Sequence, residues 1–258
     1  MKLTTYNQTV NALLSLNNLP VKQYTKDPRQ CAIYLKRMQW ILDHVGNPEK
    51  RLRFIHVAGT SGKGSVTTML HEILRAAGYR VGSYTSPYVS AYTERWHCDN
   101  KLISPEDLVE CANSALEAVE RSLTDSPYGP PSYFETLMAI AFVYFEKKKC
   151  EWVVLETGCG GDFDASNVIP PPRLAIVTNI GLDHTELLGK TRAAIAKRKA
   201  GIFKEGSVAV IGEVDPEIAA QLTTHAKEAR VKQVVRVSRP HRDTVDERGT
   251  QFTYRGKP

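Results

Sequence analysis

A glycine-rich loop carries the clearest chemical signal in this sequence. It reads Gly59-Thr60-Ser61-Gly62-Lys63-Gly64-Ser65, between an apolar run at residues 54–58 and a helical pattern at residues 65–77. A strand, a tight glycine loop and a helix N-terminus together bind anions, because unpaired backbone N–H groups and the helix dipole point at the ligand. Lys63 adds a positive charge, and the Ser65 hydroxyl is a suitable Mg²⁺ ligand. The loop therefore predicts a phosphate site, although Val57 stands where the common phosphate-loop spacing has its first glycine.

Three further segments follow strand-like runs and carry polar side chains. They span residues 84–88, 156–161 and 178–186. A hydroxyl, the Glu156 carboxylate and the His184 imidazole brought to one edge could bind a divalent cation beside the phosphates. Oxygen ligands suit Mg²⁺, whereas a histidine also suits Mn²⁺. Taken singly, a Glu at a strand end is more often a solvated terminus and a His more often structural. The neighbouring phosphate loop favours the ligand interpretation for Glu156 and His184.

Strand-like and helix-like segments alternate along the chain. The strand candidates are short, apolar and rich in valine and isoleucine, as buried parallel strands are: residues 80–84, 151–156, 174–179, 207–211 and 233–237. The sequence therefore predicts an α/β fold with a P-loop-type, mostly parallel sheet flanked by helices. Ligands of such sheets gather at the carboxyl ends of the strands.

Helix-start signals place the helices between these strands. Ser104-Pro105 and the capping box that begins at Ser132 open two of them. Further helices are expected at residues 191–200 and 216–230, with another at 31–44; residues 251–254 alternate like a strand. We expect residues 1–50 to form a helical segment packed on a main domain of residues 51–258.

Composition favours a soluble globular protein, with 42% hydrophobic and 24% charged residues. The sequence contains neither a run of about 18 apolar residues nor a signal-peptide core, so we expect a cytoplasmic protein without membrane contact. The five cysteines form no Cys-x-x-Cys pair, which predicts reduced thiols. The net charge of +6 is spread along the chain and suits phosphate and an anionic substrate better than nucleic acid. A monomer is expected.

Several of these motifs together resemble the folylpolyglutamate synthase/dihydrofolate synthase family of the Mur ligase superfamily. The resemblance runs from about Tyr6 to the last residue, and its two most specific blocks are residues 56–65 and 178–186. The remaining matches are Thr85-Ser86-Pro87, Glu94-Arg95, Ser132-Tyr133-Phe134-Glu135, Asp164-Ala165-Ser166-Asn167 and Lys199-Ala200-Gly201-Ile202.

The resemblance implies an ATP-dependent ligation of L-glutamate to a folate or dihydropteroate carboxylate through an acyl phosphate. It implies that Ser65 and Glu156 hold the nucleotide Mg²⁺, and that Ser86, Glu156 and His184 hold a second Mg²⁺. It also allows K⁺ as a cofactor. Lys199 matches the family's carbamylated lysine, so the implied catalytic residues are Lys63, Lys199 and His184, and the implied substrate-binding residues are Ser86, Pro87 and Tyr88.

The chain departs from the family pattern at three residues. Ser61 replaces an asparagine, Asp162 replaces an arginine, and Arg198 replaces a glutamate. We hypothesise that the two charge reversals, Asp162 and Arg198, compensate each other.

The chain also stops before the C-terminal α/β domain that the family carries. We therefore expect a fragment or truncated form that binds ATP–Mg²⁺ weakly and does not ligate glutamate alone. Two alternatives remain: a non-catalytic nucleotide-binding remnant of the family, and another Mur-type amino-acid ligase.

Overall fold

An eight-stranded sheet with the order β4-β3-β2-β5-β1-β6-β7-β8 forms the centre of the protein. The computed structural model describes residues 2–16, 28–237, 241–247 and 249–253. Neighbouring strands from β2 to β8 in this order run parallel, and β3 and β4 add an antiparallel edge. The strands are β1 (Arg53–Ala58), β2 (Val81–Tyr84), β3 (Trp96–Cys98), β4 (Lys101–Leu102), β5 (Trp152–Glu156), β6 (Leu174–Val177), β7 (Val208–Ile211) and β8 (Gln233–Arg236). The predicted α/β fold with a mostly parallel sheet is confirmed.

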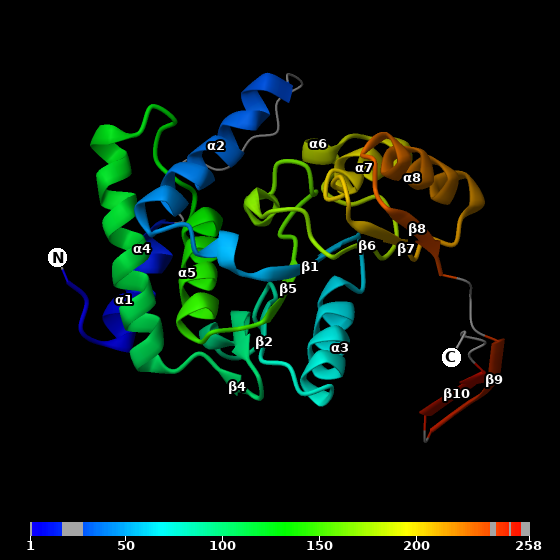
Figure 1. Cartoon of the computed structure of the whole chain (residues 1–258), viewed down its shortest axis with the longest axis horizontal. Helices are drawn as coiled ribbons and strands as arrows, with labels where there is room; N and C mark the ends of the chain where they lie inside the picture. Colours follow the sequence, from blue (N-terminus) through cyan, green and yellow to red (C-terminus); the bar gives the residue numbers. More distant parts are fainter. Residues whose placement is uncertain (1, 17–27, 238–240, 248, 254–258) are drawn as a thin grey trace.

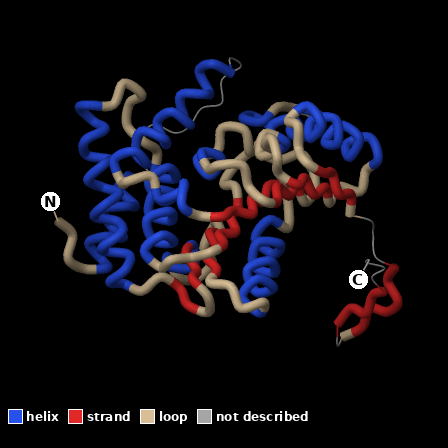
Figure 2. The backbone as a smooth tube through the Cα atoms, in the orientation of Figure 1, coloured by secondary structure: helices blue, strands red, loops and turns tan. Residues whose placement is uncertain are grey.

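Helices cover both faces of this sheet (Figures 1 and 2). Helix α3 packs against β1, β2 and β5 on one face, whereas α5 and α7 belong to core clusters on the other face. The helices are α1 (Tyr6–Ser15), α2 (Pro28–His44), α3 (Lys63–Ala76), α4 (Pro105–Asp125), α5 (Tyr133–Lys147), α6 (Thr185–Leu188), α7 (Arg192–Ala200) and α8 (Pro216–Glu228). Short 3₁₀ helices are η2 (Pro48–Arg51), η3 (Tyr92–Arg95) and η4 (Ala165–Val168).

Strand β1 lies at the middle of the sheet and is buried on both faces. Ile55 and Val57 pack toward α3, whereas Phe54 and Ala58 pack into the clusters on the opposite face. Successive side chains of a strand point to opposite faces, so a strand covered on both sides reads as a continuous apolar run. This burial fixes the direction of β1 and therefore the position of the loop that leaves its carboxyl end.

Side chains cap four of the helices, and the two caps predicted from the sequence, Ser104 and Ser132, are confirmed. Ser104 and Thr191 accept N–H groups in the first turns of α4 and α7, and Ser132 with Glu135 forms the capping box of α5. Helix α8 is capped by Asp215. The predicted start of the helix after the phosphate loop, Ser65, is wrong: α3 begins at Lys63, because Gly62 takes a left-handed conformation (φ 78°) and serves as its N-cap.

The N-terminal helices α1 and α2 contact α4 and α5. Their apolar side chains, such as Leu13, Met38 and Ile41, join the same core cluster as Phe142 of α5. The division at residue 50 stays a prediction. Strands β9 (His241–Asp246) and β10 (Gly249–Thr253) form a separate hairpin, and the strand expected at residues 251–254 falls in β10 except for Tyr254, which lies outside the described residues. Within the described chain, no helix has the length and apolar character needed to span a bilayer.

Candidate nucleotide-binding site

The glycine-rich loop joins the carboxyl end of β1 to the N-terminus of α3. Gly59 has a φ of 151°, and a Cβ atom there would lie 1.8 Å from Oγ1 of Thr178. Gly62 has a φ of 78° at the N-cap. Glycine is therefore required at both ends of the turn, once for close approach and once for a left-handed backbone.

The segment after β6 holds this loop by five hydrogen bonds, one of them from Thr60 Oγ1 to the Gly181 carbonyl (3.3 Å). Asn179 accepts the Thr60 N–H through its backbone oxygen (3.0 Å) and the Ser61 N–H through its side chain (2.8 Å). Thr178 Oγ1 donates to the Ser61 carbonyl (2.7 Å), and the Gly181 N–H donates to Thr60 Oγ1 (2.9 Å). Because Thr60 and Ser61 give their N–H groups to Asn179, the amides left for an anion are those at the start of α3.

Two lysines meet at the carbonyl of Gly59. Lys199, from the last turn of α7, is 2% exposed and donates from Nζ to the Gly59 oxygen at 2.7 Å. Lys63 Nζ donates to the same oxygen at 3.2 Å. Burial, followed by the charge of Lys63, lowers the pKa of Lys199 to about 8. A part of its population is therefore a neutral amine near physiological pH.

Glu156 brings a carboxylate to the same edge of the sheet. It ends β5, is 4% exposed, and its Oε2 accepts the Ser86 N–H at 3.1 Å. The same oxygen lies 3.4 Å from where a Cβ of Gly64 would be. Burial raises the pKa of Glu156, against the opposing effects of the Ser86 N–H and the Lys63 charge.

The oxygen donors around Glu156 fit a hard divalent cation. Ser65 lies in the first turn of α3, and among the described residues its hydroxyl makes no hydrogen bond. Carboxylate and hydroxyl oxygens are ligands that Mg²⁺ prefers, and Glu156 reaches Gly64, the residue before Ser65. A cation there would also offset the cost of burying the Glu156 charge.

His184 lies in the loop after β6, at the N-cap of α6. Its φ is 47°, its side chain is 47% exposed, and Nε2 is 3.7 Å from Asp183 Oδ1. In the described residues its ring makes no hydrogen bond to Glu156 or Ser86, and no cluster of three or more His, Cys, Asp or Glu side chains could hold a metal. The predicted metal site of Ser65, Ser86, Glu156 and His184 includes two serine hydroxyls, which a cluster of His, Cys, Asp and Glu side chains does not count. This metal site therefore stays a prediction.

The loop between β2 and β3 carries the expected substrate-binding residues Ser86, Pro87 and Tyr88. Tyr88 is 38% exposed, and the Arg95 guanidinium lies 5.0 Å from its ring centroid. The Glu94 carboxylate accepts three consecutive backbone N–H groups, at residues 89, 90 and 91, and these bonds lower its pKa. Glu94 thus fixes the conformation of the loop. The sequence analysis missed this role because the three N–H groups come together around one carboxylate only when the turn has folded.

The two charge reversals contact each other. Arg198 NH1 lies 2.8 Å from Asp162 Oδ2, and the Asp162 N–H donates to the Arg198 carbonyl at 3.0 Å. Asn167 ties the same region together, because its side-chain amide donates to the carbonyls of Asp162 and Gly201. The two reversed charges are paired, as the compensation hypothesis requires, and Arg198 is the residue before Lys199 in the sequence.

His56, Ser166 and Asp164 form a buried chain of hydrogen bonds that the sequence analysis did not predict. His56 Nε2 contacts Ser166 Oγ at 2.8 Å, and that hydroxyl donates to Asp164 Oδ1 at 2.6 Å. Burial lowers the pKa of His56 to about 3, so this imidazole is neutral. The motif residues 164–167 were visible in the sequence, but their link to β1 joins residues 110 positions apart.

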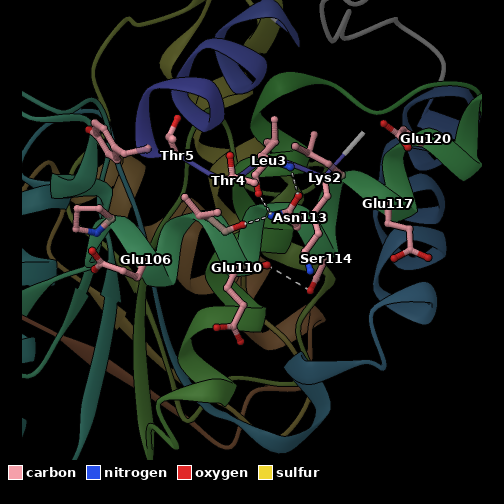
Figure 3. A pocket seen from close by; sticks show the side chains of 14 residues that line it. Lys2, Leu3, Thr4, Thr5, Glu106, Glu110, Asn113, Ser114, Glu117 and Glu120 are labelled. Atoms are coloured by element: carbon pink, nitrogen blue, oxygen red, sulfur yellow. Dashed lines mark hydrogen bonds between the residues drawn. The ribbon is translucent and has the colours of Figure 1, made fainter.

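A cavity lies away from the phosphate loop, between residues 2–6 and α4 (Figure 3). Its volume is about 850 Å³, and the side chain of Asn113 bridges it by bonding both the N–H and the carbonyl of Leu3. Glu106, Glu110, Glu117 and Glu120 line it. Four carboxylates repel a polyphosphate, so this cavity is no candidate for the nucleotide.

Comparison with known proteins agrees with the geometry of this edge. The profile of the Mur ligase middle domain matches residues 57–256, and the chain belongs to that family. It is 43% identical over 195 residues to the dihydrofolate synthase/folylpolyglutamate synthase of Bacillus subtilis, covering 75% of this chain and 45% of the relative. It is 39% identical over 185 residues to the folylpolyglutamate synthase of Lacticaseibacillus casei, covering 72% and 43%.

Solved structures give the same result. The FPGS–AMPPCP–folate complex superimposes with a TM-score of 0.85 at 33% identity, covering 97% of this chain and 59% of that one. The E. coli FolC complex with ADP gives 0.75 at 30% identity, covering 94% and 56%. The resemblance to folylpolyglutamate synthases and dihydrofolate synthases is confirmed, and the chain spans about half the length of the curated relatives it matches.

The Asp162–Arg198 pair gives a direct test of compensation. We expect Asp162→Ala and Arg198→Ala each to lower the free energy of unfolding, and the double variant to lose less than the sum, with a coupling of about 1 kcal/mol. Urea titration of all four proteins measures it, with the exposed Lys197→Ala as the control. Strict additivity of the two single effects would contradict compensation.

Proposed function

We propose that this chain is the nucleotide-binding part of an ATP-dependent ligase that joins L-glutamate to a folate or dihydropteroate carboxylate. The single observation that carries the proposal is the convergence of Lys63, Lys199 and Glu156 on the loop between β1 and α3. The named relatives and the complexes with AMPPCP, folate and ADP support it. In this proposal residues 51–258 form the ATP-binding domain, and residues 1–50 form a helical segment packed on it.

The chemical difficulty of such a ligation is repulsion between anions. A substrate carboxylate must attack the γ-phosphate of ATP to form an acyl phosphate, from which the amino group of glutamate displaces phosphate. In our proposal the N–H groups at the start of α3 and the Lys63 ammonium hold the phosphates and stabilise the charge that builds up during attack. The N–H groups of Thr60 and Ser61 donate to Asn179, so these two residues support the conformation of the loop and do not bind phosphate through their amides.

The metal sites belong to the same proposal. Ser65 and Glu156 would hold the nucleotide Mg²⁺, and Ser86, Glu156 and His184 a second one, with Mn²⁺ or K⁺ as further cations that the resemblance allows. A bound Mg²⁺ neutralises phosphate charge and orients the reacting oxygens. Tyr88 and Pro87 would line the substrate side of this edge. We further propose a monomer in the cytoplasm.

Lys199 has a separate role in the proposal. Its neutral Nζ attacks carbon dioxide, a C–N bond forms, and one proton leaves to solvent, which gives a carbamate. The modification replaces a buried ammonium with an anion that has two oxygens, so it can orient water on a nearby cation. The burial that lowers the pKa of Lys199 to about 8 supplies the neutral amine that this step needs.

Titration calorimetry tests the proposed function. The chain should bind ATP in the presence of Mg²⁺, and Lys63→Ala should weaken binding about tenfold, since a charged hydrogen bond contributes ~1.5 kcal/mol. Lys227→Ala, on the exposed side of α8, is the control. Added binding of dihydropteroate or tetrahydrofolate would support the folate ligase. Binding of ATP alone would favour the non-catalytic alternative, and absence of ATP binding would contradict the proposal.

The carbamate has its own pH dependence. Because only the neutral amine reacts, the carbamate should increase as pH rises through about 8 and fade below it. Carbon-13 NMR of the chain in labelled bicarbonate measures the signal. Lys199→Arg should abolish it, whereas Lys204→Arg should retain it, although burial lowers the pKa of Lys204 to about 8 too. A signal that depends on Lys204, or none at any pH, would contradict the assignment.

A further inference from the structure

A pair of thiols lies at the antiparallel edge of the sheet, apart from the loop that carries Lys63. Sγ of Cys98 and Sγ of Cys150 are 3.7 Å apart, and the two residues are 6% and 5% exposed. All five cysteines lie in the described part of the chain, and none forms a disulfide bond. This is a contact between side chains 52 positions apart in the sequence.

The backbone holds both cysteines in place. Cys98 ends β3 and is the register partner of Gly82 in β2. Cys150 follows α5, and its N–H donates to the Phe145 carbonyl at 3.0 Å. The ring of Phe145 packs directly on Gly82, where a Cβ atom would lie 2.5 Å from it, so the end of α5 and the turn that carries Cys150 lie close to β2 and its partner β3.

The surroundings distinguish the two sulfurs. The hydrogen bond from Cys150, with further help from Arg80, lowers the pKa of Cys98 despite its burial. The same contact and burial raise the pKa of Cys150. Arg80 is half exposed and lies 3.7 Å from Asp99, at the rim of the pair. Arg80 contacts Cys98 rather than Cys150, so its positive charge favours the thiolate at Cys98 and leaves Cys150 as the proton-bearing neighbour.

We propose that Cys98 and Cys150 are a modification site, a dithiol that a peroxide converts reversibly into a disulfide bond. The Cys98 thiolate attacks one peroxide oxygen, the O–O bond breaks, hydroxide leaves, and a sulfenic acid forms. The Cys150 sulfur then attacks the Cys98 sulfur, the S–S bond forms, and the S–O bond breaks. The departing hydroxide takes the Cys150 proton and leaves as water, so two sulfur-derived electrons reduce one peroxide.

The disulfide would cross-link the edge strand β3 to the turn between α5 and β5. It would close the long segment that contains all of α4 and α5, and such closure restricts the unfolded chain. We therefore expect the oxidised protein to melt about 5 °C higher than the reduced one. A thiol reductant returns it to the starting state.

Thiol mapping of the native chain tests this site. The reduced native protein is treated with hydrogen peroxide, the peroxide is removed with catalase, and the protein is alkylated under denaturing conditions, digested without reductant and analysed by mass spectrometry. Two of the five thiols should be lost together, with a fall of about 2 Da and one cross-linked peptide pair containing Cys98 and Cys150. Dithiothreitol should restore both thiols and the original melting temperature.

Cysteine variants supply the matched controls. Cys98→Ser and Cys150→Ser should each abolish the linkage, whereas Cys111→Ser, which removes a buried thiol of the same core cluster, should retain it. Retention of all five thiols, linkage to a different cysteine, or sulfinic acid at Cys98 without linkage would each overturn the proposal. The assay uses no nucleotide, so its outcome is independent of the proposed ligase function.

Discussion

Gly59 can pass Thr178 only because it has no side chain, and this close approach controls the shape of the loop between β1 and α3. The loop does not have to satisfy its own backbone, since Asn179 accepts two of its N–H groups. Because Asn179 holds the loop, the loop does not fold back over the first turn of α3. The N–H groups of that first turn then have no partner within the helix, which is the condition for anion binding.

The charged side chains around the loop depend on the same arrangement. Lys199 reaches the Gly59 carbonyl from the last turn of α7, and its burial is tolerated because it finds that oxygen and loses part of its affinity for protons. Glu156 reaches the start of α3 from the neighbouring strand β5. Two lysines and a carboxylate thus surround the backbone amides at one edge. The Asp162–Arg198 contact lies one residue from Lys199 and helps to fix the end of α7.

Much of this architecture could be predicted from the sequence, because local patterns specify it. Apolar runs located the parallel strands, and caps such as Ser132 located the helices. Strands β3 and β4 were missed since they have three residues and two residues, and pairing with β2 defines them. Long-range contacts in the site were also missed. Thr178 and Asn179 were recognised as part of a motif, but their hydrogen bonds to the loop connect residues more than 100 positions apart, which no local pattern predicts. The Asp162–Arg198 contact was anticipated because two departures of opposite charge occurred together.

The central claim is that the amides at the start of α3, Lys63 and Glu156 form one site for the phosphates and their cation. A crystal structure of this chain with a non-hydrolysable ATP analogue and Mg²⁺ tests it most directly. The account predicts phosphate oxygens within hydrogen-bonding distance of the N–H groups of residues 62–65 and of Lys63 Nζ, with the metal on Ser65 and Glu156. A triphosphate bound at another edge of the sheet, or beside the acidic lining of α4, would contradict it.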